Sequence, residues 1–106
     1  MSQFKERRSQ QMSRYSELQE EYFPDLETYT LAITRAHGKN HPETFKVHEL
    51  FNKIEAKSQA KEDVSSEYQE IRKLTDNYKI PTDACPTMEK TYNFLSELDQ
   101  AYSTEK

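Results

Sequence analysis

Apolar and polar residues alternate along this chain with the period of an α-helix. The first apolar stripe has spacings of three and four, which predicts one helix from about Ser2 to Ala36. Pro24 falls inside the stripe without shifting its phase, so a single helix kinked at Phe23–Pro24 is favoured over two separate helices. The stripe comprises Met12, Tyr15, Leu18, Tyr22, Leu26, Tyr29 and Ile33.

A second helix is expected to begin at Pro42, because proline fits the first helical turn, where its missing N–H costs no hydrogen bond. The only glycine, Gly38, precedes it and is expected to end the first helix in the left-handed conformation. The sequence therefore predicts a sharp corner between the two helices. The core face of the second helix comprises Phe45, Val47, Leu50, Phe51 and Ile54.

The boundary between the second and third helices is weakly marked, since no glycine or proline occurs between Pro42 and Pro81. Ser66 with Gln69 resembles a capping box and places a break near Asp63–Ser66. The alternative is one uninterrupted helix. The third apolar stripe comprises Val64, Tyr68, Ile71, Leu74 and Tyr78.

The link Lys79–Pro86 contains two prolines and is expected to be partly extended. A fourth helix follows from about Thr87. Four helical segments without a strand signal predict an all-α protein, a four-helix bundle with a short hinge between helices two and three. The fourth stripe comprises Met88, Tyr92, Leu95, Leu98 and Tyr102.

The length of 106 residues fits a single helical domain, 1–106. Its start, 1–13, is basic and is expected to fray, because cations are unfavourable at the positive end of a helix dipole; a basic arm that contacts a partner is the alternative. A net charge of −4 disfavours broad nucleic-acid binding. A single cysteine and no long apolar stretch favour a cytoplasmic protein without a membrane partner.

The three histidines offer little catalytic chemistry. His37 and His41 have the i,i+4 spacing of a zinc-binding helix, but Gly38 interrupts the helix that such a site requires. His37 continues the first stripe, so its ring is expected to point into the bundle as a core or ligand histidine. His41 is expected at the helix entry and His48 to be partly exposed. No motif assigns a catalytic residue, and no enzyme activity is expected.

Ser58 and Glu62 lie four residues apart where the second apolar stripe would continue, so both are expected to face the core. A carboxylate in that position is costly unless it is paired, bound to a metal or reached by water. Four-helix di-iron proteins place histidine and glutamate ligands at such positions. The alternative is that the core opens to water because the helix ends.

The segments RYSELQEEYFPDLETYTLAITRAHGKNHPE and IRKLTDNYKIPTDACPTMEKTYNFLSELD resemble the iron–sulfur-cluster-repair di-iron proteins, a hemerythrin-like family. The resemblance covers about Arg14 to Glu105 with a gap, and rests mainly on the VHGxxHPE-like corner and the LTxNYxxPxDAC link. It implies an antiparallel four-helix bundle. In full-length members it also implies an oxo-bridged di-iron site and a role in repairing damaged clusters under nitrosative or oxidative stress.

Carried over by this resemblance, two ligand positions have lost their histidines, at Ser16 and Ser58. His37 and Glu62 are retained, and Glu105 stands where the last ligand motif begins. A further family histidine has no counterpart. The resemblance therefore implies a degenerate metal site with His37, Glu62 and Glu105 as candidate ligands, too few to hold two irons.

These observations favour a non-catalytic binding or regulatory module that acts through protein contacts and needs no cofactor. One alternative is a residual metal-binding protein with a partial iron site, in cluster repair or nitrosative stress. Another is a small acidic inhibitor of a basic partner protein. A homodimer is expected because one small polar core is marginal; a straight continuation through the hinge would make it domain-swapped.

Overall fold

The structure is a computed structural model of the 106-residue chain, and it describes residues 13–105. Within that range the chain forms four α-helices and no strand, which confirms the all-α prediction. Most of the predicted basic start, 1–13, lies outside the described residues. The helices are α2 (Arg14–His37), α3 (Glu43–Gln59), α4 (Ser65–Leu74) and α5 (Pro86–Glu105).

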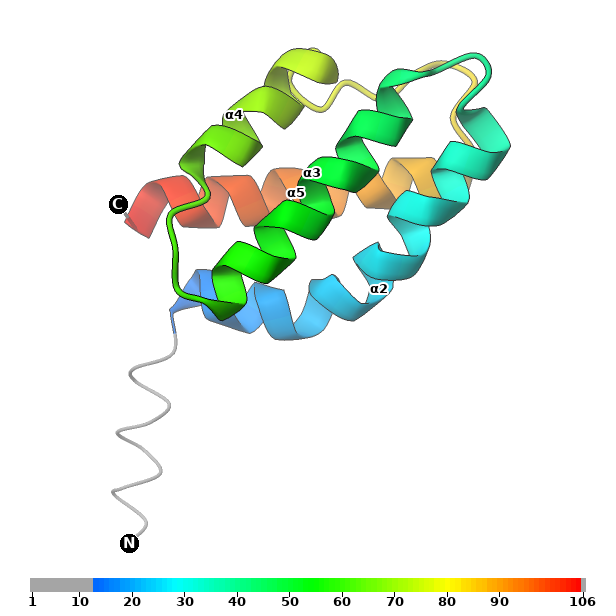
Figure 1. Ribbon diagram of the computed structural model, residues 1–106. Coiled ribbons are helices and arrows are strands. Elements are labelled where there is room, and N and C mark those ends of the chain that lie inside the picture. Colours follow the sequence, from blue (N-terminus) through cyan, green and yellow to red (C-terminus); the bar gives the residue numbers. More distant parts are fainter. Residues whose placement is uncertain (1–12, 106) are drawn as a thin grey trace, which may run out of the picture.

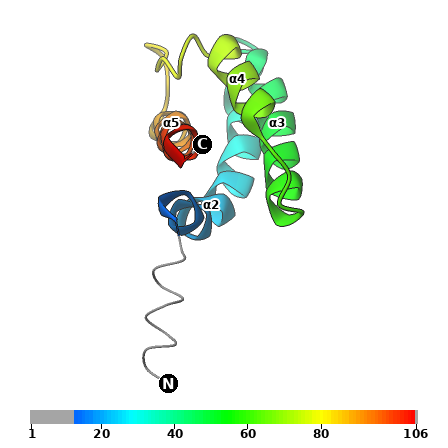
Figure 2. The same ribbon diagram turned by 90° about the vertical axis from the view of Figure 1, so that its left-hand side faces the viewer.

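The helices pack in a bundle-like arrangement in which α2 contacts both α3 and α5 (Figure 1). α3 also packs against α4, whereas α4 and α5 meet over a smaller area. Viewed from the side, α3 and α4 lie together and α5 lies apart from them, above the first part of α2 (Figure 2). No helix in residues 13–105 combines the length and apolarity that a membrane crossing requires.

The two ends of the molecule are named here because the candidate sites lie at them. The corner end holds the α2–α3 corner, 38–42, and the α4–α5 link, 75–85 (Figure 1). The turn end holds the α3–α4 turn, 60–64, together with the start of α2 and the last turn of α5.

A capping serine and an internal proline shape α2. The Ser13 side chain accepts a hydrogen bond from the Ser16 N–H, which satisfies one donor of the first turn. The helix runs through Pro24 without a break, which confirms one helix rather than two. Figure 1 shows that its two parts point in different directions, as expected when a proline ring crowds the preceding turn.

The corner differs from the prediction in two respects. Gly38 has φ −59° and ψ −30°, a right-handed conformation, so the predicted left-handed glycine is wrong. Phe45, predicted to face the core, is 57 % exposed. A Cβ added at Gly38 would clash with the Thr34 carbonyl oxygen and would lie 2.6 Å from the Phe45 ring. The glycine therefore allows close packing rather than an unusual backbone angle.

The predicted break between the second and third helices is confirmed, since α3 ends at Gln59 and α4 begins at Ser65. Lys61 takes a left-handed φ of 61°, and the Glu62 N–H donates back to the Lys57 carbonyl. The chain thus reverses in a tight turn, and in this structure it does not continue as one helix. The predicted capping box is wrong, because the N-cap of α4 is Val64 and makes no side-chain cap bond.

Two groups of buried apolar side chains hold the helices together. The smaller group lies near the corner end and has half-buried Cys85 packed against it, as expected of a structural thiol. It contains Ile33, Met88 and Tyr92. The larger group draws on all four helices: Tyr15, Leu18, Phe23, Leu26, Val47, Leu50, Phe51, Ile54, Val64, Tyr68, Ile71, Leu95, Leu98 and Ala101.

Candidate functional site

The three predicted metal ligands do not come together. A Glu105 oxygen accepts a hydrogen bond from the Tyr15 N–H at 2.8 Å, which places this carboxylate beside the first turn of α2. His37 is the last residue of the same helix. At about 1.5 Å per residue, His37 and Tyr15 are roughly 30 Å apart. His37 therefore lies at the corner end, and Glu62 and Glu105 lie at the turn end.

Glu62 is exposed in the turn, so its predicted orientation toward the core is wrong. The physical reason is that α3 ends at Gln59 and the helical register is lost before residue 62. At the lost ligand positions, the Ser58 Oγ is buried without a hydrogen-bond partner, and the Ser16 Oγ accepts from Ser13 at 3.1 Å. In residues 13–105, no three His, Cys, Asp or Glu side chains form a metal-binding group. These residues do not fit a di-iron site.

Tyrosines fill much of the turn end. The hydroxyls of Tyr15 and Tyr68 lie 2.9 Å apart, and the Tyr15 ring also packs on Tyr102 with centroids 4.9 Å apart. Burial raises the pKa of Tyr15, and that of Tyr68 well above its usual range. Tyr102 donates to Asp63 at 2.7 Å and accepts from the Val64 N–H, so it fastens the turn to α5. This hydrogen-bonded cluster is structural.

The corner end holds two of the histidines. The His37 Nε2 is buried without a partner, and its ring centroid lies 6.2 Å from that of His41. His41 begins the approach to α3 as predicted, and contacts Asp83 at 2.9 Å and Glu43 at 3.3 Å. The hydrogen bond to Asp83 raises the pKa of His41 and lowers that of Asp83. The pair ties the corner to the link before α5.

A second unpartnered polar atom lies in the small buried group near the corner. Tyr92 is 1 % exposed, and its hydroxyl has no hydrogen-bond partner. Burial, together with the nearby Glu43 carboxylate, raises the pKa of Tyr92 to about 12. This phenol stays neutral at physiological pH.

Polar side chains line the α2–α3 seam. His48 is partly exposed, as predicted, and its Nδ1 lies 2.8 Å from the Thr30 hydroxyl. Further along the seam, Glu55 faces Glu27. Partial burial, followed by a hydrogen bond with Glu27, raises the pKa of Glu55 to about 7. Glu55 is therefore partly protonated near neutral pH.

An ion pair between a buried carboxylate and a partly exposed arginine joins α4 to α5. Asp99 is 4 % exposed and accepts hydrogen bonds from Arg72 at 2.7 Å and from the Tyr78 hydroxyl at 2.7 Å. Burial, followed by the bond to Asp99, raises the pKa of Tyr78 far above its usual range. Tyr78 ends a run of left-handed residues that begins at Asp76. This turn places the phenol on Asp99, which is a structural role.

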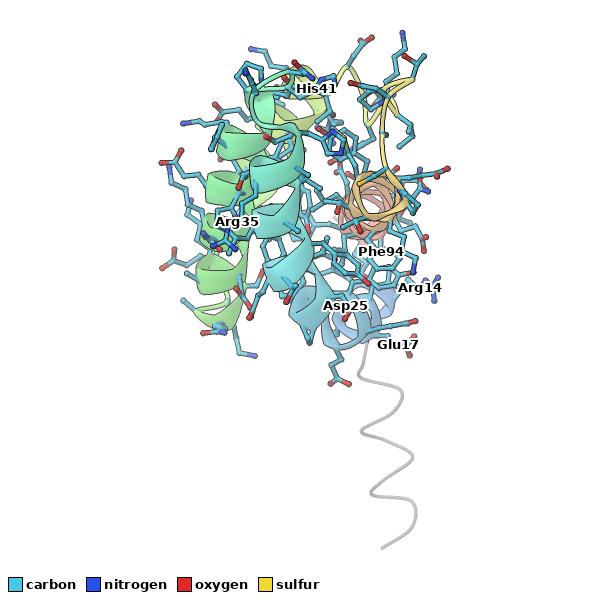
Figure 3. The ribbon with its side chains drawn as sticks, turned by 90° about the vertical axis from the view of Figure 1, so that its right-hand side faces the viewer. Arg14, Glu17, Asp25, Arg35, His41 and Phe94 are labelled. Atoms are coloured by element: carbon cyan, nitrogen blue, oxygen red, sulfur yellow. The ribbon has the colours of Figure 1, made fainter. Side chains whose placement is uncertain are left out.

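Three half-buried aromatic residues lie along the α2–α5 seam. Tyr22 stacks on Phe94 with centroids 4.0 Å apart and planes 2° apart, and Tyr29 lies 6.2 Å from the same ring. The Tyr22 hydroxyl donates to Glu97 at 2.9 Å. We call Tyr22, Tyr29 and Phe94 the aromatic strip. Figure 3 shows Phe94 projecting from α5 beside the first part of α2.

Two of the three residues of the strip could be predicted from the sequence, and Phe94 could not. Tyr22 and Tyr29 belong to the predicted stripe of α2, and both are half-buried. Phe94 lies outside the stripe of α5, which passes through Tyr92 and Leu95, so only the register between the two helices brings it onto Tyr22. The available signal in the sequence is a phenylalanine that lies outside the apolar stripe of its own helix.

No family model, no curated protein and no solved structure matches this chain. The resemblance to the hemerythrin-like repair proteins therefore remains a hypothesis that rests on the quoted sequence segments.

Proposed function

We propose that this chain is a non-catalytic protein-binding module with a hemerythrin-like four-helix bundle and a degenerate metal site. The observation that carries the proposal is the aromatic strip. Its three rings are stacked and only half-buried at a helix seam. Tyrosine and phenylalanine are enriched where proteins bind one another, because they supply rigid apolar area at low entropic cost.

The separation of the candidate ligands supports the loss of the metal site. A di-iron centre needs several imidazoles and bridging carboxylates within a few ångströms of each other. Here His37 is roughly 30 Å from Tyr15, the residue that Glu105 contacts. Tyrosine rings in tilted contact and a hydrogen-bonded pair of tyrosine hydroxyls lie at the turn end, in place of imidazoles.

One observation favours the alternative of a residual iron protein. The His37 Nε2 is buried without a partner, and a histidine ligand awaiting a metal has the same appearance. Two carboxylates, Asp83 and Glu43, already engage the neighbouring His41. Iron content of the purified protein separates this alternative from the binding module.

The proposal includes a homodimer, and the exposed Phe45 is the residue that we expect a second copy to cover. Together with Leu31, which is 39 % exposed, it is one of two large apolar side chains exposed in residues 13–105. A small polar chain gains stability when pairing buries such residues. This surface lies at the corner and is distinct from the aromatic strip.

Capture of a partner by an affinity-tagged chain tests the module directly. We expect the unmodified chain to retain a stoichiometric protein partner that Phe94→Ala loses, because that substitution removes the ring on which both tyrosines stack. Glu70→Gln is the control, since it alters an exposed side chain on α4, away from the α2–α5 seam. If all three proteins capture the same set, the aromatic strip is not the binding surface and the proposal fails.

A further inference from the structure

Every charged side chain of α2 between Arg14 and Arg35 is acidic. No lysine or arginine occurs between Arg14 and Arg35. Within residues 13–105, none of the acidic side chains in that interval forms an ion pair. Unneutralised carboxylates on one helix create a negative potential over the adjoining surface. The acidic residues are Glu17, Glu20, Glu21, Asp25 and Glu27.

The aromatic strip lies within this negative field. Burial raises the pKa of Tyr22, and the hydrogen bond and charge of Glu97 and the charge of Glu21 raise it further. Figure 3 shows Glu17 and Asp25 on α2, in the same region as Phe94. A ring face already attracts cations through its quadrupole, and surrounding carboxylates strengthen that attraction.

A groove of about 390 Å³ continues from the strip along the α2–α5 seam. Its lining combines apolar Leu18 and Ala101 with the carboxylates of Glu97 and Glu105. Glu97 links the groove to the aromatic strip, because its carboxylate also accepts a hydrogen bond from the Tyr22 hydroxyl. An apolar surface with carboxylates at its edge suits a long cationic side chain, whose methylene stem packs while its charged head is paired.

We propose that the aromatic strip and this groove bind an arginine- or lysine-rich segment of a partner protein. The inference rests on the proposed binding function and names the chemistry of the partner. Charge complementarity carries it: α2 offers carboxylates that form no ion pair within residues 13–105, Glu17, Glu21 and Asp25 among them, beside the stacked rings. The same field repels nucleic acid and anionic membranes, both of which carry negative charge.

Arg14 gives the proposal a second, opposite test. It is the one cation among the residues that line the groove, and it forms no ion pair within residues 13–105. A basic ligand must approach this charge, so Arg14 weakens binding. Arg14→Gln should therefore increase the affinity for a cationic ligand, whereas loss of a carboxylate should reduce it.

The experiment titrates the full chain with a short arginine-rich peptide and with the same peptide carrying citrulline, a neutral isostere. Because the chain has no tryptophan, its fluorescence comes from its seven tyrosines, and binding at the strip is followed through the contribution of Tyr22 and Tyr29. We expect the citrulline peptide to bind at least about tenfold more weakly, as a lost charge-assisted pair implies. Phe94→Ala and Glu97→Gln should each weaken the arginine peptide about five- to tenfold.

Glu70→Gln acts as the control for these substitutions, because it removes an exposed carboxylate on α4, away from the α2–α5 seam. It should leave the affinity unchanged. If Glu70→Gln weakens binding as much as Glu97→Gln does, the attraction depends on net charge alone and the inference is overturned.

The two proposals can fail separately. If the arginine peptide does not bind but partner capture still requires Phe94, the chain is a binding module whose partner is not basic. If the peptide binds and is lost with Phe94→Ala, the inference holds. If neither peptide binding nor partner capture depends on Phe94, both proposals are refuted.

Discussion

Glu55→Gln should change how stability depends on pH, because it removes the carboxyl group that lies against Glu27. The pKa of Glu55 is about 7 in the folded chain, compared with 4.5 for the ordinary group. The folded state therefore binds this proton more tightly than the unfolded state does. This contribution to stability is fully present below about pH 4.5 and is lost as pH rises to 7.

The size of the effect follows from the pKa difference. One pKa unit corresponds to about 1.4 kcal/mol, so the full difference sets an upper limit of about 3 kcal/mol. Solvent reduces it, because Glu27 is exposed and Glu55 is only partly buried. We expect about 1–2 kcal/mol of stability to be lost between pH 5 and pH 8 through this pair.

Urea unfolding followed by circular dichroism across this pH range measures the effect. Glu55→Gln should keep its stability at high pH and show a shallower decline, because the neutral amide has no proton to lose. Glu70→Gln, which removes an exposed carboxylate on α4, should retain the pH profile of the unmodified chain. Equal slopes for the Glu55→Gln protein and the unmodified chain would refute the reasoning.

Three further predictions follow from the buried polar groups and the corner. Asp99→Ala should destabilise the fold by about 1–3 kcal/mol in thermal unfolding, because it leaves partly exposed Arg72 and half-buried Tyr78 without their partner; a loss below about 0.5 kcal/mol would contradict this. His37→Leu should fold with equal or greater stability, since a buried unpartnered nitrogen is removed, and a large loss of stability would favour a functional ligand. Light scattering at micromolar concentration should give a dimer mass that Phe45→Ser reduces to a monomer mass; a monomeric unmodified chain would exclude the dimer.

The helices could be predicted because their apolar stripes are local properties of the sequence. The apolar period continues through Pro24 unchanged, and α2 likewise continues through Pro24 without a break. The close packing at the corner could not be predicted in this way, since the Phe45 ring that contacts Gly38 lies seven residues away along the chain. Helical periodicity cannot reveal such a contact, because by its spacing alone Phe45 is an ordinary apolar residue on the core face of its helix.

The candidate site shows the same division. Glu62 was assigned to the core by extending a stripe past Gln59, where the helix in fact ends. The length of α2 alone separates His37 from the turn end, and this could be inferred from the sequence once one kinked helix was chosen. The Tyr22–Phe94 stack depends on the relative register of two helices, which a single sequence does not encode locally.

Iron analysis of the chain purified from iron-supplemented cells tests the central claim, a binding module without a di-iron centre, most directly. His37 lies far from Glu62 and Glu105, so we expect substoichiometric iron and no near-ultraviolet absorption of an oxo-bridge. Two irons per chain accompanied by that absorption would contradict the account.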